Sequence, residues 1–111
     1  MKRIYVAGPC TGVPDLNFPA FHAEAARLRA LGYDVVSPAE INGDAAPTSG
    51  DHFEHWARCM ALDIPHLLTC DTVAFLPGFL NSSGSFVELF LANAFRITKV
   101  LASEITTGPA A

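Results

Sequence analysis

Four short, mainly apolar runs, separated by segments of helical periodicity, constrain the fold of this chain more than any other feature of its sequence. The runs occupy residues 3–7, 33–37, 72–76 and 97–102. Runs of this length, bounded by glycine, proline or polar residues, predict buried strands. Because most of them are nearly continuous and do not alternate with polar residues, they predict a parallel sheet that is covered on both faces.

The segments between these runs predict the helices that would cover such a sheet. After Asn17, the expected N-cap, apolar residues recur at helical spacing until Gly32 supplies a stop. A second helix is expected to begin after Asp51 and to kink or end at Pro65, and a third is predicted over residues 83–95. Alternating strands and helices predict an α/β fold: a small parallel sheet of about four to five strands with helices on both faces, flavodoxin-like or Rossmann-like.

Length and composition predict one folded domain. A chain of 111 residues can bury a sizeable core without disulfides or a metal. Half of the residues are hydrophobic and 16% are charged, which argues against disorder. We expect a single domain over residues 1–102 and a flexible C-terminal tail over residues 103–111.

Charge and hydropathy exclude several classes of partner. The net charge of −4 and the seven Lys and Arg residues do not fit a protein that binds a nucleic acid polymer. The apolar run at the N-terminus is too short for a signal peptide, and no run is long enough to span a membrane. We therefore expect a cytoplasmic protein with no membrane partner.

The sequence carries no motif for a metal or an organic cofactor. The three cysteines lack the spacing of a CxxC pair or a zinc ribbon, so reduced thiols are expected. His52 and His55 lack the four-residue spacing of a helical zinc motif, and no third ligand is evident. We expect neither a metal nor a cofactor.

Two loops are the expected ligand-binding segments, because open parallel sheets bind ligands beyond the carboxyl ends of their strands. The loop after the first strand contains Gly8, Pro9, Cys10 and Gly12, and the loop after the third strand contains Ser82, Gly84 and Ser85. The second loop leads into a helix, whose N-terminal N–H groups and dipole favour an anion such as a 5′-phosphate. The alternative is that its serines are only turn and cap residues.

Glu88 is the first candidate for chemistry. Its simplest interpretation is a capping box, because Ser85 and Glu88 have the required spacing. However, the helix is apolar on nearly every side, so we expect it to be buried, with Glu88 as its only acidic residue facing the ligand. A buried carboxylate at such a position favours a functional role.

Asp63 is the second candidate. On a helical wheel it falls on the apolar stripe of the second helix, close to Trp56, Met60 and Leu67. A carboxylate in that place requires a partner. An arginine partner, the cap of a neighbouring helix and a catalytic role all stay open.

The motifs together resemble a known superfamily. The matching segments are residues 4–9, 31–38, 63, 70–71, 76–78 and 82–88. They are similar to the nucleoside 2-deoxyribosyltransferase superfamily, closest to its short DUF4406 branch. The resemblance extends to about residue 102 and implies an α/β fold with a nucleoside or nucleotide as its small-molecule ligand.

The resemblance implies a role for three side chains. In the superfamily a glutamate after the third strand attacks the anomeric carbon of the sugar, or stabilises its positive charge, and Glu88 occupies that place. Asp63 matches the residue that protonates or holds the departing base. Tyr5 resembles a tyrosine that contacts the glutamate, with ordinary strand packing as its alternative. The helix N-terminus is expected to help keep Glu88 ionised.

Comparison within the superfamily bears on the substrate. Ser82 stands where the 5′-monophosphate N-glycosidases carry a phosphate-binding serine, and this favours a monophosphate. Phe86 replaces a second glycine of those enzymes and is expected to narrow the pocket, and the first loop lacks an arginine found in relatives. Because the chain is short, a neighbouring subunit of a homodimer or higher oligomer is expected to complete the site.

The preferred function is therefore hydrolysis or transfer of the N-glycosidic bond of a (deoxy)nucleoside 5′-monophosphate. Phosphoribohydrolase activity on a ribonucleotide is an alternative, because residues 76–88 also resemble the motif of those enzymes. A non-catalytic nucleotide sensor and a purely structural domain are two further hypotheses that the residues leave open. The long polar loop over residues 42–51 is hypothesised to close on the substrate.

Overall fold

The computed structural model describes residues 1–9, 14–42 and 52–110 of the chain. Its strands are β1 (Arg3–Ala7), β2 (Asp34–Val36), β3 (Thr72–Phe75) and β4 (Thr98–Leu101). Its α-helices are α1 (Phe18–Ala30), α2 (Pro38–Asn42), α3 (His52–Leu67) and α4 (Ser83–Ala94). Three short 3-10 helices are η1 (Pro14–Asn17), η2 (Phe79–Asn81) and η3 (Ala102–Glu104). The four predicted strands and three predicted helices are all present.

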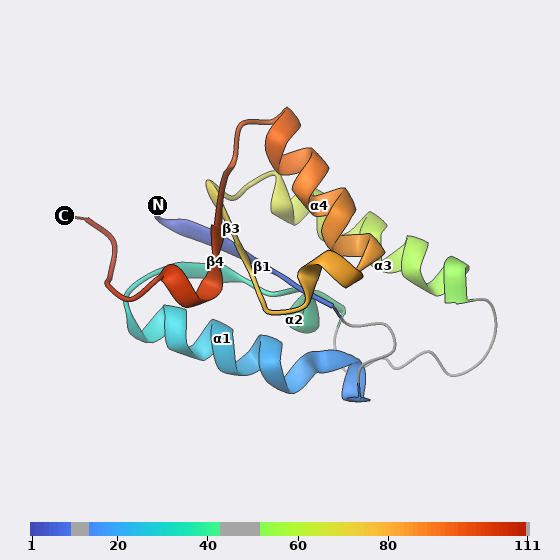
Figure 1. The fold of residues 1–111 in the computed structure, drawn as a ribbon, viewed down its shortest axis with the longest axis horizontal. Helices are drawn as coiled ribbons and strands as arrows, with labels where there is room; N and C mark the ends of the chain where they lie inside the picture. Colours follow the sequence, from blue (N-terminus) through green and yellow to red (C-terminus); the bar gives the residue numbers. More distant parts are fainter. Residues whose placement is uncertain (10–13, 43–51, 111) are drawn as a thin grey trace.

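The strands form one parallel sheet in the order β2-β1-β3-β4 (Figure 1). This confirms the predicted α/β fold. The chain leaves β1 to build β2 on one side and then returns to build β3 on the other. β1 and β3 therefore lie side by side at the point where the strand order reverses, and the Leu76 N–H donates to the Ala7 carbonyl just beyond them at 2.7 Å. Such a reversal is where open α/β sheets bind ligands.

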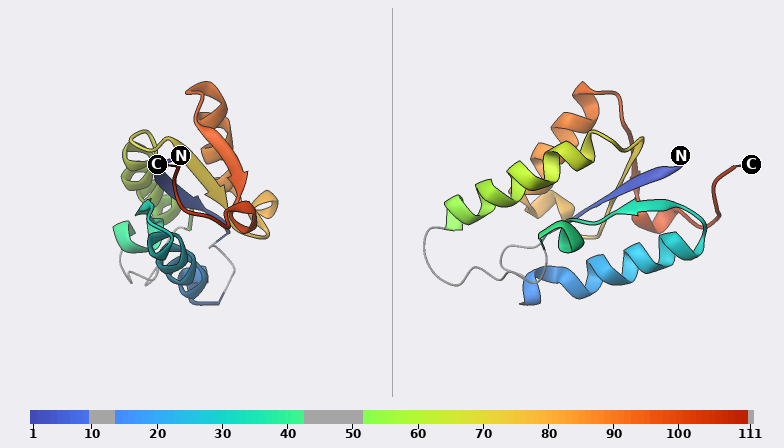
Figure 2. Two further views of the ribbon diagram at one scale, coloured as in Figure 1. Left: turned by 90° about the vertical axis from the view of Figure 1, so that its left-hand side faces the viewer. Right: turned by 180° about the vertical axis from the view of Figure 1, so that it is seen from behind.

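The helices form a layer on each face of the sheet. α1 covers one face, and α3 and α4 cover the other (Figures 1 and 2). Side chains along β1 alternate between these layers: Ile4 and Val6 belong to the core under α1, whereas Tyr5 and Ala7 belong to the core under α3 and α4. The period of two along a strand thus directs Tyr5 towards the two helices on which the candidate carboxylates lie.

Three local details differ from the prediction. Asn17 is not a side-chain cap: it has a φ of 60° and its side-chain amide instead donates to the Pro9 carbonyl at 2.9 Å. α3 continues through Pro65 to Leu67, so this proline lies in the last turn. α2 was not predicted, because Pro38 is compatible both with the end of a strand and with the first turn of a helix.

The packed domain extends beyond residue 102, the boundary expected from the sequence. Ile105 is buried in the core under α1, and its carbonyl accepts a hydrogen bond from the Arg27 side chain at 2.6 Å. Further along, the Tyr33 hydroxyl donates to the Thr107 carbonyl at 2.8 Å. The C-terminal segment therefore contributes to the layer that covers the α1 face.

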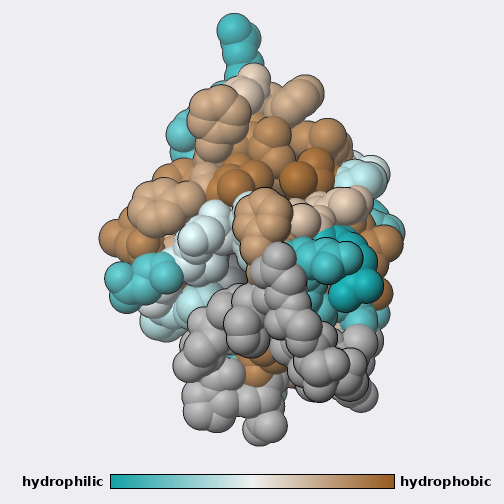
Figure 3. Space-filling view, turned by 90° about the vertical axis from the view of Figure 1, so that its right-hand side faces the viewer, coloured by the Kyte–Doolittle hydropathy of each residue, from teal (hydrophilic) through white to brown (hydrophobic). Residues whose placement is uncertain are grey.

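The expectation that α4 is buried on nearly every side is wrong. Only one stripe of α4 is buried, formed by Ser85, Glu88 and Ala92, while Phe86 is 52% and Phe90 is 70% exposed. A helix that packs on one face of a sheet, with solvent on its outer side, can bury only the stripe that meets the sheet and the neighbouring helix. Figure 3 shows apolar residues gathered on this side of the molecule. The homodimer expected from the sequence stays a prediction.

Candidate active site

Three buried polar side chains meet on the α3–α4 face of the sheet: Tyr5 from β1, Asp63 from α3 and Glu88 from α4. Tyr5 has no exposed surface, and each carboxyl residue is 5% exposed. The negative charges of Glu88 and Asp63 both raise the pKa of the Tyr5 hydroxyl, after burial, which is the largest cause. The three residues predicted from the sequence therefore form one electrostatically coupled cluster.

Helical spacing explains why the two carboxyl side chains are buried. Asp63 lies one turn before Leu67 on the buried stripe of α3, and Glu88 lies one turn before Ala92 on the buried stripe of α4. Leu67 and Ala92 both belong to the core on this face of the sheet, so they hold the two helices against β1 and β3. The apolar anchors one turn away thus place both carboxyl groups over the sheet.

Burial raises the pKa of Glu88 to about 8, and the nearby charge of Asp63 adds to this rise. The neighbouring Tyr5 hydroxyl opposes it without cancelling it. The expectation that the helix N-terminus keeps Glu88 ionised is therefore wrong. Glu88 lies in the second turn of α4, and the effect of the helix dipole fades within the first. A pKa raised this far favours the protonated form of Glu88 at neutral pH.

Burial also raises the pKa of Asp63, to about 6. The side-chain amide of Asn42, at the end of α2, donates to Asp63 Oδ1 at 2.9 Å and opposes the rise. The same amide donates to the Pro38 carbonyl at 2.9 Å, which fixes its orientation. The partner of Asp63 in the described part of the chain is thus the side-chain amide of Asn42, and not an arginine or the backbone N–H groups of a helix N-terminus.

Asn42 is a site residue that sequence reasoning missed. Its position at the start of a polar loop gave no indication that it would meet Asp63. The contact depends on the packing of α2 against α3, and a helix of five residues with a proline at its start gives little sequence signal. A side-chain amide next to a buried carboxyl can supply both a donor and an acceptor.

The N-terminus of α4 is capped by Ser82. Its Oγ accepts a hydrogen bond from the Ser85 backbone N–H at 3.2 Å. The capping box between Ser85 and Glu88 is therefore wrong, because the helix begins at Ser83 and Ser85 already lies inside it. The interpretation that the loop serines include a cap residue is correct for Ser82. Glu88 has no capping role, and the Ser85 side chain is buried.

Several buried polar side-chain atoms of the described residues have no hydrogen-bond partner. Among the described residues, the buried side-chain atoms without a hydrogen-bond partner are Tyr5 OH, Ser37 Oγ, Asn42 Oδ1, Trp56 Nε1 and Ser85 Oγ. A buried polar group that lacks a partner costs free energy, so such groups in a native protein call for a water, an ion or a ligand. All but Ser37 belong to the carboxyl cluster, to its partner Asn42 or to the two helices above it.

The first loop is only partly described. A Cβ atom added to Gly8 would lie 2.8 Å from Leu76 Cβ, so this glycine is required for the close approach of the two strand ends. Pro9 accepts the hydrogen bond from Asn17. Cys10 and Gly12, both predicted to bind substrate, lie outside the described residues, as does the hypothesised lid beyond Asn42.

Phe86 lies on the outer side of α4. It lies two residues before Glu88, about 200° away around the helix, and its side chain is 52% exposed. The expectation that Phe86 narrows the pocket stays a prediction. The second glycine of related enzymes is replaced here by a residue on the outer side of α4.

The described residues lack two further features. No group of three His, Cys, Asp or Glu side chains among them is arranged to hold a metal ion. No helix within the described ranges has the length and hydropathy needed to cross a membrane.

Known structures share this fold. A 2-deoxyribosyltransferase from Bacillus psychrosaccharolyticus matches with a TM-score of 0.65 at 21% identity, over 89% of this chain and 70% of the other. A conserved protein from Enterococcus faecalis V583 matches with a TM-score of 0.64 at 25% identity, over 91% of this chain and 62% of the other. A 2-deoxyribosyltransferase from Leishmania mexicana matches with a TM-score of 0.59 at 16% identity, over 91% of this chain and 63% of the other.

The fold thus places the chain among α/β proteins of 2-deoxyribosyltransferase architecture. The chain belongs to the family described as a domain of unknown function, DUF4406, whose model matches residues 2–101. Both findings confirm the resemblance found in the sequence. The chain spans 62–70% of the length of these solved structures. Among curated proteins no match was found.

The raised pKa of Glu88 predicts that protein stability falls as pH rises. Below the ordinary pKa near 4.5 the group is protonated in both states; between 4.5 and about 8 the unfolded chain ionises while the folded chain does not. Glu88→Gln removes this penalty, so it should raise the free energy of unfolding at pH 8 by about 2–4 kcal/mol and change it little at pH 4. Urea unfolding at both pH values measures the difference.

The matched control is Glu54→Gln, which removes a carboxylate from an exposed position of α3. Its free energy of unfolding should follow that of the wild type at both pH values. If the free energy of unfolding changes equally with pH in Glu88→Gln and the wild type, burial does not hold the proton on Glu88.

Proposed function

We propose that this chain cleaves or transfers the N-glycosidic bond of a (deoxy)nucleoside 5′-monophosphate. The observation that carries the proposal is the buried pair of carboxyl groups, Glu88 and Asp63, which lies with Tyr5 on the α3–α4 face of the sheet. Enzymes that break a bond to an anomeric carbon commonly use two carboxyl groups with different pKa values.

Glu88 acts as the nucleophile. Its carboxylate oxygen forms a bond to the anomeric carbon while the bond from that carbon to the base nitrogen breaks, and the electron pair of the broken bond leaves with the base. Asp63 donates a proton to the departing base. Water, or a second base, then takes the sugar from Glu88, and the Asp63 carboxylate accepts the proton that this step releases.

The distribution of protons within the pair matters for this mechanism. In the ligand-free protein the pKa values of about 8 for Glu88 and about 6 for Asp63 leave the proton mainly on Glu88 at pH 7. The reactive arrangement has the proton on Asp63 instead. Positive charge that develops on the sugar stabilises the Glu88 carboxylate, and the unpaired Tyr5 hydroxyl can donate to it.

The N-terminus of α4 supports a phosphorylated substrate. Ser82 caps this helix by accepting a hydrogen bond, so its hydroxyl proton stays available to a ligand. The first N–H groups of a helix have no acceptor within it, and the helix dipole favours an anion there. The buried face of α4 then leads from Ser85 to Glu88 in one turn, from the phosphate towards the anomeric carbon.

The solved relatives support the class of reaction. Two of the proteins that share this fold are named 2-deoxyribosyltransferases, and we extend glycosyl transfer on nucleosides to this chain as part of the proposal. A nucleotide sensor without turnover is the second candidate. The observation that favours it is the protonated Glu88 of the ligand-free protein, which is not yet the nucleophilic form.

Base release from nucleotides tests the proposal. Wild-type protein incubated with ribo- and 2′-deoxyribonucleoside 5′-monophosphates should release free base, with and without an added acceptor base, as measured by chromatography. Glu88→Ala should lower kcat/KM by more than about 1000-fold, because the nucleophile is lost. Glu54→Gln, the matched loss of an exposed carboxylate, should retain full activity.

The substrate preference then identifies the reaction. Release from 2′-deoxyribonucleotides supports the deoxyribosyl reaction, and release only from ribonucleotides supports phosphoribohydrolase activity. If nucleotides bind saturably, with the same affinity in the wild type and Glu88→Gln, but no base is released, the protein is a nucleotide sensor and not an enzyme. Equal base release by the wild type and Glu88→Ala would contradict the role of Glu88.

The pH dependence of kcat/KM tests the sharing of the proton. Because the active form carries one proton on the pair, kcat/KM should peak near pH 7 and fall on both sides, with limbs near pH 6 and pH 8. In Asp63→Asn only Glu88 titrates, so its lower rate should rise with pH and reach a plateau without an alkaline limb. A bell-shaped profile retained in Asp63→Asn would contradict this assignment.

A further inference from the structure

Trp56 contributes a hydrogen-bond donor that neither the fold nor the proposed chemistry uses. It lies in the second turn of α3, and its indole Nε1 is buried without a partner among the described residues. An indole N–H can only donate, so an acceptor from outside these residues is required to satisfy it. The cost of a buried unpaired donor gives a ligand that supplies this acceptor an advantage.

The indole lies against the first turn of α4. A Cβ atom added to Gly84 would be 3.4 Å from Trp56 Nε1 and 3.8 Å from Ser82 Oγ. The indole N–H and the capping hydroxyl therefore flank the same glycine. Residue 84 has no side chain, and the thioether sulfur of Met60 lies as close to the added Cβ position as the indole nitrogen does, at 3.4 Å.

A second unpaired group belongs to the same turn. The Ser85 side chain is 1% exposed and its Oγ has no hydrogen-bond partner among the described residues. Ser82 Oγ already accepts from the Ser85 N–H, so its own proton is available to donate. Donors from Trp56 and Ser82 thus lie beside Gly84, and the unpaired Ser85 hydroxyl belongs to the next residue of the same turn. A ligand that satisfies these donors has to be rich in acceptors.

The spacing along both helices relates this position to the carboxyl pair. Ser85 precedes Glu88 by about one turn on the buried stripe of α4, a rise of roughly 5 Å. Trp56 precedes Asp63 by two turns on α3. The donor position and the carboxyl pair therefore lie at successive levels between the same two helices, as the phosphate and the anomeric carbon do in a sugar 5-phosphate.

We propose that Trp56 selects the phosphorylated substrate, by donating its indole N–H to a 5′-phosphate oxygen held at the N-terminus of α4. This inference rests on the proposed function and adds a residue that determines specificity. A sugar without the phosphate leaves the buried N–H unpaired, so it binds more weakly than the phosphorylated sugar. Trp56 also fixes the end of the substrate that is farthest from the base.

The experiment uses the fact that Trp56 is the only tryptophan in the chain. Protein with a 15N-labelled indole gives one side-chain N–H signal, which is followed while 2-deoxyribose 5-phosphate or ribose 5-phosphate is added. The signal should move downfield and saturate with at least one sugar phosphate. The unphosphorylated sugars should leave it in place. These probes contain no base, so the base preference of the protein does not affect the result.

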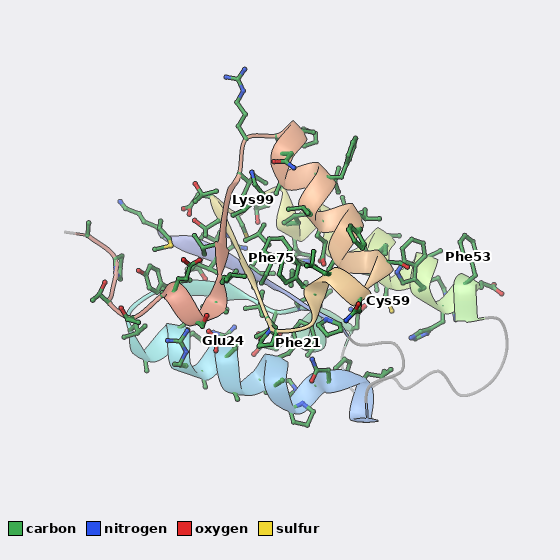
Figure 4. All side chains as sticks on the ribbon, in the orientation of Figure 1. Phe21, Glu24, Phe53, Cys59, Phe75 and Lys99 are labelled. Carbon is green, nitrogen blue, oxygen red and sulfur yellow. The ribbon has the colours of Figure 1, made fainter. Side chains whose placement is uncertain are left out.

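Two variants separate the donor from the aromatic packing. Trp56→Phe keeps a ring but removes the N–H, and it should weaken binding of the sugar phosphate about 10-fold without changing the binding of the unphosphorylated sugar. Phe53→Leu is the matched control. Phe53, labelled on α3 in Figure 4, carries no donor. Its ring lies 5.7 Å from the Trp56 ring, so its loss should leave the affinity for the phosphate unchanged.

The outcomes distinguish this inference from the proposed function. If a sugar phosphate binds with no movement of the indole signal, or with equal affinity in Trp56→Phe, the role of Trp56 is overturned even though Glu88-dependent base release stands. An indole signal that responds to inorganic phosphate but to no sugar phosphate also overturns it. If no sugar phosphate binds and no nucleotide releases base, both proposals fail. The signal of the wild type decides the matter even if Trp56→Phe does not fold.

Discussion

The pairing of β1 with β3 at the centre of the sheet is the constraint on which the rest of the structure depends. It leaves β1 covered by strands on both sides and by helices on both faces, and the alternation along β1 directs Tyr5 to the α3–α4 face. Gly8 lets the chain beyond β1 approach Leu76 closely. The two helices that flank β3 in the sequence then carry Asp63 and Glu88 to the same place above it.

Burial of two carboxyl groups is unfavourable unless they lose a charge, find a partner or serve a function. Here Asp63 has the Asn42 amide as its partner, whereas Glu88 retains its proton to about pH 8. Between about pH 6 and pH 8 the two carboxyl groups therefore share one proton, which lies mainly on Glu88. A substrate that develops positive charge next to Glu88 would move that proton towards Asp63, which couples binding at the site to the chemistry proposed for it.

The sequence predicted the strands from continuous apolar runs, and Tyr5 lies within the first of these. The main helices and the burial of Asp63 followed from apolar residues at helical spacing, whereas the burial of Glu88 was expected from the apolar composition of its helix. It did not predict Asn42 or the unpaired Trp56 Nε1, since these depend on how α2 and α4 pack against α3. The sequence allowed Ser82 as a turn or cap residue and Ser85 as the start of a capping box, and only the observed start of α4 separates them. The apolar sequence of α4 suggested burial on every side, whereas the helix buries only one stripe.

The central claim, that Glu88 attacks the anomeric carbon, is tested most directly by trapping the sugar on the protein. Fluorine at C2 of the sugar slows formation and breakdown of the intermediate, because it destabilises positive charge at the anomeric carbon. After incubation with 2′-fluoro-2′-deoxynucleoside 5′-monophosphates, intact mass spectrometry should show one added fluorosugar phosphate, and peptide mapping should place it on Glu88. Release of base from unmodified nucleotides with no adduct on Glu88, or an adduct on another residue, would contradict the account.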